Sequence, residues 1–136
     1  GFMLEWDHWI NHSTKQPHMS ELKIIDAHHH FWDLSNGSIY YPWLQGEDPE
    51  HFFLGEYESL RSDFLPPDYR RDSANHNIVK TVHVEAECKR DQQLEETQWL
   101  TSLNEEQGMP DAIVAHAIAN GLIFAVAVTT GQLHII

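Results

Sequence analysis

The chain has 136 residues, of which 41% are hydrophobic and 11% aromatic, and this fits one globular domain and excludes intrinsic disorder. Its 21 acidic and 8 basic residues give a formal net charge of -13, which repels phosphate backbones and anionic lipid surfaces. We therefore expect neither nucleic acids nor membranes as partners. The single cysteine, Cys88, excludes an internal disulfide. Residues 1–18 lack a signal-peptide pattern and no apolar run is long enough for a membrane span, so the expected location is the cytoplasm.

Three segments differ in composition. Residues 1–18 are rich in Trp, His and polar side chains without a clear period, and we expect them to be a poorly ordered appendage. Residues 19–117 carry recognisable strand and helix patterns. Residues 118–136 are an apolar tail that diverges from those patterns.

The first predicted strand is residues 22–25, an apolar run with β-branched side chains that leads directly into Asp26. A long connection over residues 31–77 comes next, and it is rich in Asn, Gly and Pro turn signals. We expect a short helix at 56–62 and a turn at 68–73 within it. Loops of this length in compact domains are usually functional.

The second half of the pattern predicts a parallel sheet. Residues 78–85 alternate and are rich in Val, which indicates a second strand, and residues 112–117 indicate a third. Between them, residues 91–107 are the best helix candidate, with Asp91 as its N-cap and Gly108 at its end. A strand, a helix and a strand in this order predict the α/β class with a right-handed crossover.

Each predicted strand ends in groups that can bind a metal ion or move protons. His28 and His30 are two residues apart, so on an extended chain both imidazoles project from the same face. Asp26 shares that face, where it can orient a ring or share the ion, whereas His29 points the other way and is expected to be packed. Asp26, His28 and His30 are the predicted metal ligands, and Zn²⁺ or Mn²⁺ suits such a set.

The next two strands contribute the predicted catalytic residues. Glu85 ends the second strand and His116 lies on the third, so both are expected near the same edge of the sheet. The alternative is structural, because a histidine near a strand end is more often hydrogen-bonded to the backbone than bound to a ligand. His83, deeper in the second strand, is a weaker candidate than Glu85.

Other features allow two interpretations. Four aromatic residues come closely after the histidines and either wall a pocket or form a satellite core: Trp32, Tyr40, Tyr41 and Trp43. Arg70 and Arg71 could hold a substrate carboxylate, but surface ion pairs are expected in so acidic a chain. Cys88 has no evident partner base, and we expect it to be inert.

The segment Ile25-Asp26-Ala27-His28-His29-His30-Phe31-Trp32-Asp33 resembles the opening strand motif of the amidohydrolase-related family, also called amidohydrolase family 2. Within it the lactonase-like branch is the most similar. Three later segments resemble that branch in the same order, namely residues 81–87, 95–100 and 111–117. The resemblance covers about residues 19–117 of the 136.

The resemblance implies metal-assisted hydrolysis of a small-molecule lactone or cyclic amide or ester. In metal-bearing members, the histidines that match His28 and His30 hold a divalent ion; in members without a tightly bound metal, they would contact substrate. It also implies a TIM-type (β/α)8 barrel. A complete barrel needs about 250 residues, so the expected fold is its N-terminal portion, with about three β/α units and incomplete.

The sequence departs from the family after the third strand. The family's further histidines and its general-base aspartate lie on later strands, so they cannot be carried over, and we expect the isolated chain to be inactive. Residues 118–136 do not resemble the expected helix. We hypothesise that this tail, and residues 1–18, come from a shifted reading frame or a misjudged gene boundary.

Two other functions stay open. One is a non-catalytic barrel fragment whose open sheet edges favour self-association. The other is a His-rich module for metal binding or interaction, without chemistry of its own.

Overall fold

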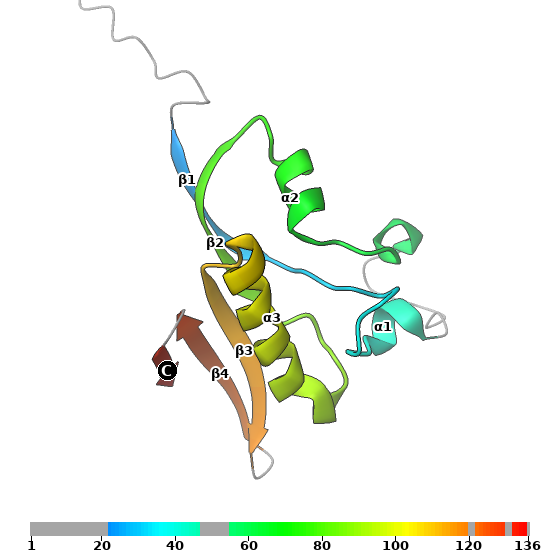
Figure 1. The fold of residues 1–136 in the computed structure, drawn as a ribbon. Coiled ribbons are helices and arrows are strands. Elements are labelled where there is room, and N and C mark those ends of the chain that lie inside the picture. Colours follow the sequence, from blue (N-terminus) through cyan, green and yellow to red (C-terminus); the bar gives the residue numbers. More distant parts are fainter. Residues whose placement is uncertain (1–21, 47–54, 120–121, 130–131, 136) are drawn as a thin grey trace, which may run out of the picture.

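The computed structural model describes residues 22–46, 55–119, 122–129 and 132–135, with side chains described up to residue 116 (Figure 1). One sheet has the strand order β1-β2-β3-β4-β5. Its strands are β1 (Lys23–His29), β2 (Asn77–Val84), β3 (Ala112–Ala119), β4 (Leu122–Thr129) and β5 (Gln132–Ile135). The first three run parallel, and β4 and β5 continue the sheet with antiparallel pairing.

Among the described residues, three α-helices and two 3₁₀-helices connect or cover the strands: α1 (Pro42–Gln45), η2 (Glu58–Leu60), α2 (Pro66–Asp72), η3 (Arg90–Gln92) and α3 (Gln93–Gln107). The helix α3 is the crossover between β2 and β3 and lies alongside β3 (Figure 1). It ends as predicted at Gly108, whose φ of 74° is a left-handed conformation that glycine adopts without strain. The predicted N-cap is wrong, because Asp91 lies in η3 and Gln92 is the N-cap of α3.

The predicted fold class, the N-terminal portion of a TIM-type barrel, is wrong. The chain forms a small α/β structure whose three-stranded parallel sheet is not closed, and β4 turns back antiparallel along β3 from Ala119↔Leu122 to Ala112↔Thr129. A barrel would need a helix and another parallel strand there. The physical reason is visible in the sequence. Residues 118–129 are apolar and rich in Ile and Val, and they are interrupted by Asn120-Gly121, a dipeptide that strongly favours two-residue hairpin turns.

The tail that was expected to diverge therefore contributes β4 and β5, whereas the predicted appendage at residues 1–18 lies outside the described residues. The expected short helix at 56–62 is η2, and the expected turn at 68–73 is the helix α2. In the described part of the chain, no helix has both the length and the apolar character needed to cross a membrane.

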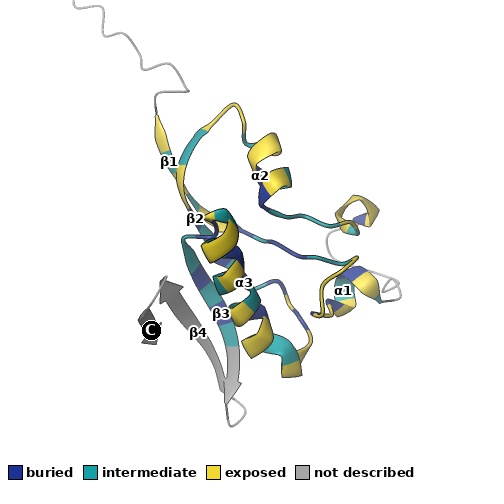
Figure 2. Cartoon of the chain, in the orientation of Figure 1, coloured by how far each residue is buried: buried dark blue, intermediate teal, exposed yellow. Residues whose placement is uncertain are grey.

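Two apolar clusters hold the elements together, and Figure 2 shows their buried segments between α3 and the sheet and along the chain before α1. The first cluster lies where α2 and α3 meet the sheet: Phe31, Tyr69, Leu100, Leu103, Met109, Ile113 and Ala115. The second lies under the long connection: Trp32, Ile39, Tyr41, Leu44, Ala86 and Cys88. Two of the four aromatic residues, Trp32 and Tyr41, are thus satellite-core residues.

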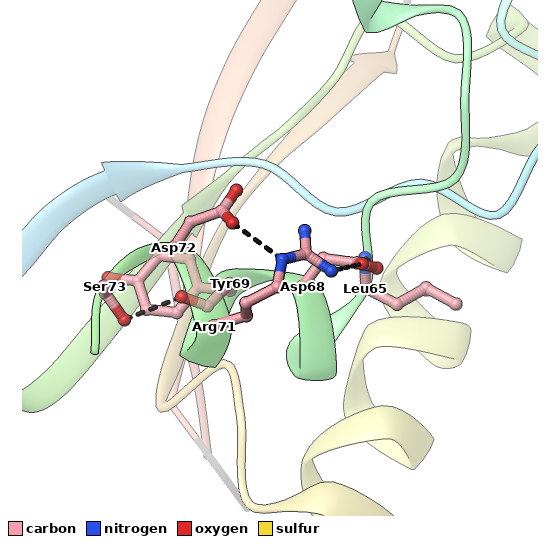
Figure 3. Close-up of polar contacts among 6 residues, drawn as sticks. All are labelled: Leu65, Asp68, Tyr69, Arg71, Asp72 and Ser73. Carbon is pink, nitrogen blue, oxygen red and sulfur yellow. Dashed lines mark hydrogen bonds and ion pairs between the residues drawn. The ribbon is translucent and has the colours of Figure 1, made fainter.

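In the helix α2, Arg71 forms ion pairs with two aspartates. Asp68 accepts a 3.1 Å hydrogen bond from the backbone N–H of Leu65 and a 2.7 Å contact from the guanidinium of Arg71 (Figure 3). The same guanidinium lies 3.0 Å from Asp72. The expected surface ion pairing of Arg71 is thereby confirmed.

Candidate functional site

A register shift in β1 precedes the histidines. Asp26 pairs with Thr81 and His29 pairs with His83, so three steps along β1 match two steps along β2. Such a bulge inserts an extra residue and changes the direction of the side chains around it. The result is an exposed His28 followed by a buried His29.

The structure brings the rings of His28 and His30 together. Their Nε2 atoms lie 3.2 Å apart, and Nδ1 of His30 lies 2.8 Å from the carbonyl oxygen of Val84. Nδ1 must donate to that carbonyl, which leaves the lone pair of His30 on Nε2, directed at His28. A backbone carbonyl that fixes a ring in this tautomer is a recurrent support for histidine metal ligands.

This spacing fits a shared divalent ion. Two nitrogens bound to one tetrahedral ion at about 2.0–2.1 Å lie about 3.3–3.4 Å apart, close to the 3.2 Å between His28 and His30. Burial lowers the pKa of His30, and the neighbouring His28 lowers it further, against the hydrogen bond to Val84. The ring is therefore neutral at physiological pH, as a ligand must be.

Asp26 is engaged by protein groups on both of its oxygens. Oδ1 accepts a 3.1 Å hydrogen bond from the backbone N–H of His28, and Oδ2 accepts a 2.6 Å hydrogen bond from the hydroxyl of Tyr69. Partial burial acts to raise the pKa of Asp26, but these two hydrogen bonds outweigh it and the pKa is lowered. Asp26 thus orients the backbone at His28; its role as a metal ligand stays a prediction.

The other two histidines of this region are packed in the interior. His29 is buried and packed, as predicted, with its ring centroid 4.5 Å from that of Phe31 and 5.0 Å from that of Tyr69. His83 is fully buried and lies 3.4 Å from the carbonyl oxygen of Phe31. Burial lowers the pKa of His29 to about 4 and that of His83 to about 3, so both are neutral.

The two predicted catalytic residues lie next to each other. Glu85 follows β2 directly and His116 lies in β3, and Nδ1 of His116 is 3.7 Å from a carboxylate oxygen of Glu85. The parallel pairing of Val84 with Val114 produces this juxtaposition. An ion pair exists here when His116 is protonated. The catalytic role of both residues stays a prediction.

One neighbour was missed in the sequence. Glu87 shares the space of Glu85 and His116, and the ligand atoms of the three side chains lie within 4.8 Å of one another. Its backbone N–H donates a 2.8 Å hydrogen bond to Glu85, and its φ of 55° is unusual for a residue other than glycine. Glu85 and Glu87 are two residues apart, as His28 and His30 are, and this spacing is the sequence signal that could have identified Glu87 as a candidate.

Glu85 and Glu87 border an open groove of about 930 Å³ at the strand ends, which we call the strand-end groove. His30, Trp43, Glu85 and Glu87 are among its lining residues. Trp43 donates a 2.8 Å hydrogen bond from its indole nitrogen to the carbonyl of Ala86, which fixes it as a wall. A second pocket of about 470 Å³ contains Asp26 and Tyr69 and also reaches His30.

Glu96, a buried carboxyl of α3, interacts with Ala86 and Cys88, which line the strand-end groove. Glu96 of α3 is buried, and desolvation raises its pKa to about 7, although the nearby hydroxyl of Tyr41 acts in the opposite direction. Burial and the charge of Glu96 raise the pKa of Cys88 to about 12. The thiol therefore stays protonated near neutral pH, in accord with its expected inertness.

Comparisons with known proteins identify a curated relative and give no function. No family model matches the chain, and no solved structure matches it. The chain is 38% identical over 100 residues to the uncharacterized protein y4mH of Sinorhizobium fredii. The match covers 73% of this chain and 32% of the relative, so the chain spans about a third of the length of the curated relative that it matches.

Proposed function

We propose that this chain binds a divalent metal ion through His28 and His30 and derives from the amidohydrolase-related, lactonase-like hydrolases. The observation that carries the proposal is the 3.2 Å approach of the two Nε2 atoms, with His30 held in its tautomer by Val84. The ordered motifs at residues 25–33, 81–87 and 111–117 support the lineage. A cytoplasmic location is part of this proposal.

The reaction proposed for the lineage is hydrolysis of a lactone or a cyclic amide or ester. A Zn²⁺ or Mn²⁺ ion held by the histidines would polarise the substrate carbonyl or lower the pKa of a water molecule. Asp26 holds the backbone of His28, and the carbonyl of Val84 orients the ring of His30. Glu85 is the carboxylate proposed to accept a proton from that water molecule, which leaves Glu85 neutral, and His116 lies 3.7 Å from it.

Little or no turnover is expected from this chain by itself. Catalytic zinc sites usually have three protein ligands, and the histidine pair supplies two. Any activity of a longer relative would depend on residues beyond the third of its length that this chain spans. The chain by itself is therefore proposed to bind metal, and the hydrolase activity belongs to its lineage.

Metal analysis of the purified protein tests the proposal. We expect Zn²⁺ titration calorimetry to detect a site whose affinity falls at least about tenfold in His28→Ala and in His30→Ala. The matched control is His76→Ala, since His76 is exposed and adjoins the opposite end of β1, where Asn77 pairs with Lys23. Equal Zn²⁺ affinity in the wild type and all three variants would contradict a metal site at His28 and His30. Rapid hydrolysis of simple lactones would contradict the expected inactivity.

A second candidate function is self-association without catalysis. The observation that favours it is the apolar margin of β1, where Ile25 is 64% exposed and Leu22 is 50% exposed. An edge strand of this kind can pair with another chain. Sedimentation that shows a dimer, together with an absence of metal binding, would support this function over the first.

A further inference from the structure

We infer that Glu85, Glu87 and His116 form a second cation site, which we call the Glu-His cluster. It goes beyond the proposed function and does not depend on the histidine pair of β1. The ligand atoms of its three side chains lie within 4.8 Å of one another. They come from two adjacent parallel strands, because Glu85 and Glu87 follow β2 while His116 lies on β3 (Figure 1).

The charge of the cluster is unbalanced. Two carboxylates face each other with a histidine, and in the described part of the chain neither Glu85 nor Glu87 forms an ion pair with a lysine or an arginine. The lysine closest in sequence, Lys89, is engaged 2.9 Å from Asp91. Carboxylates this close repel each other unless a proton or a cation lies between them.

His116 supplies the nitrogen ligand of the cluster. Its side chain is only 18% exposed, and its Nε2 atom is buried without a hydrogen-bond partner in the described part of the chain. The other ring nitrogen, Nδ1, lies 3.7 Å from Glu85, which is too far for a hydrogen bond. Nδ1 therefore forms no hydrogen bond with the carboxylate beside it, and it is the ring nitrogen available to an ion held by Glu85 and Glu87.

The backbone at Glu87 brings the third ligand into place. A φ of 55° turns the chain so that the Glu87 N–H donates to the Glu85 carboxylate and the two side chains converge. An extended conformation there would let the chain continue away from β3. Strained conformations outside glycine persist where the surroundings impose them, and they concentrate at functional sites.

The ligand set indicates which ion the cluster would take. Two carboxylates and one imidazole suit Mn²⁺ or Zn²⁺, and the preponderance of oxygen ligands favours Mn²⁺ relative to the two-nitrogen site of His28 and His30. The carboxylates lie at the wall of the strand-end groove, so an ion can enter and solvent or substrate can fill its remaining positions. In this arrangement Glu85 and His116 act as ligands, and this role replaces the proton-accepting role proposed above for Glu85.

Mn²⁺ titration followed by electron paramagnetic resonance tests the inference. The full chain carrying His28→Ala and His30→Ala is the background. Because these two substitutions remove the histidine pair, any remaining Mn²⁺ binding tests the Glu-His cluster and not the proposed function. We expect this background to keep a Mn²⁺ site, which weakens at least about tenfold on adding Glu87→Gln or His116→Gln. Glu105→Gln, on the exposed side of α3, is the matched control and should change the affinity less than about twofold.

Glu87 is exposed, so Glu87→Gln should leave the fold intact, and circular dichroism of each variant checks this. Mn²⁺ affinity that is unchanged by Glu87→Gln and by Glu85→Gln would overturn the cluster, as would a background without a Mn²⁺ site. Loss of binding in the background alone would contradict the cluster but leave the histidine pair standing. If the background binds Mn²⁺ and the Zn²⁺ affinity of the otherwise wild-type protein is unchanged by His28→Ala, only the proposed function is contradicted.

Discussion

The hydroxyl of Tyr69 donates a 2.6 Å hydrogen bond to Oδ2 of Asp26, and this contact ties α2 to β1 two residues before the exposed His28. The two residues are separated by 43 positions in the sequence. Asp26 also holds the backbone of His28 through its other oxygen. The long connection between β1 and β2 thus returns to support the backbone from which the first histidine projects.

Tyr69→Phe removes this hydrogen bond and keeps the packed ring. Hydrogen bonds to charged groups contribute about 1.5–3 kcal/mol, and since Asp26 is only partly buried we expect a loss near the lower end, about 1–2 kcal/mol. Urea unfolding provides the measurement. Tyr40→Phe is the control, because Tyr40 is 40% exposed, and a loss of equal size in that variant would contradict the assigned role of the hydroxyl.

Glu96→Gln should remove a pH dependence of stability. Burial raises the pKa of Glu96 to about 7, against about 4.3 for glutamate in an unfolded chain. The folded state therefore binds the proton more tightly, and the resulting stability is complete below about pH 4 and is lost as the pH rises through about 7. At about 1.4 kcal/mol for each pKa unit, the loss amounts to about 4 kcal/mol.

Unfolding free energies at about pH 5 and about pH 8.5, on either side of the shifted pKa, give the comparison. Between these pH values the wild type should lose stability relative to Glu96→Gln, and Glu96→Gln should be the more stable of the two at the higher pH. The buried neutral His29 and His83 add the same rise in stability with pH to both proteins, so the difference between the two profiles is the measured quantity. The exposed neighbour on the same helix, Glu95→Gln, should follow the wild type. Parallel pH profiles for wild type and Glu96→Gln would show that the carboxyl is ionised throughout.

Leu100→Ala tests the packing of α3 on the sheet. Leu100 is fully buried in the first apolar cluster, and removal of such a side chain leaves a cavity that typically costs about 2–5 kcal/mol. Leu94 lies on the same helix but is 67% exposed, so Leu94→Ala should change stability by no more than about 0.5 kcal/mol. Similar losses in both variants would mean that α3 is not docked on the sheet as described.

Asp111→Ala and Lys80→Ala separate a backbone hydrogen bond from a surface ion pair. Asp111 accepts a 2.9 Å hydrogen bond from the backbone N–H of Thr81 and a 2.5 Å contact from Lys80. We expect a loss of about 1–2 kcal/mol for Asp111→Ala. The side chain of Lys80 is 63% exposed, so Lys80→Ala should cost less than about 1 kcal/mol. Thermal melts of both variants show which loss of stability is larger. A larger loss for Lys80→Ala than for Asp111→Ala would contradict the role assigned to the backbone hydrogen bond.

The periodic part of the fold could be predicted from the sequence. The three parallel strands and α3 follow from apolar runs separated by Gly108 and Pro110, because burial of such runs dominates over local detail. The antiparallel pairing of β3 with β4 was not predicted, because the resemblance to a barrel favoured a helix after β3, although Asn120-Gly121 between these two strands is a local turn signal. The resemblance applies to the segments that carry the motifs. The pairing of the last strands depends on the residues that follow these segments.

The site was predicted only where spacing alone determines geometry. The two-residue repeat of His28 and His30 was sufficient to place two rings together, and strand order brought Glu85 to His116. The bulge between Asp26 and His29, the left-handed Glu87 and the burial of Glu96 depend on tertiary packing. No periodicity encodes such features, so Asp26 was expected at the ion and is found hydrogen-bonded to Tyr69.

β1 lies at the margin of the described sheet and pairs with β2 alone. Elements at such margins open more readily than the interior of a domain, with an opening free energy of their own. Each opening of β1 would separate His28 and His30, so the persistence of the strand sets an upper limit on how long they can retain an ion. By linkage, an ion bound there would slow amide hydrogen exchange in β1 while leaving α3 and β3 unaffected.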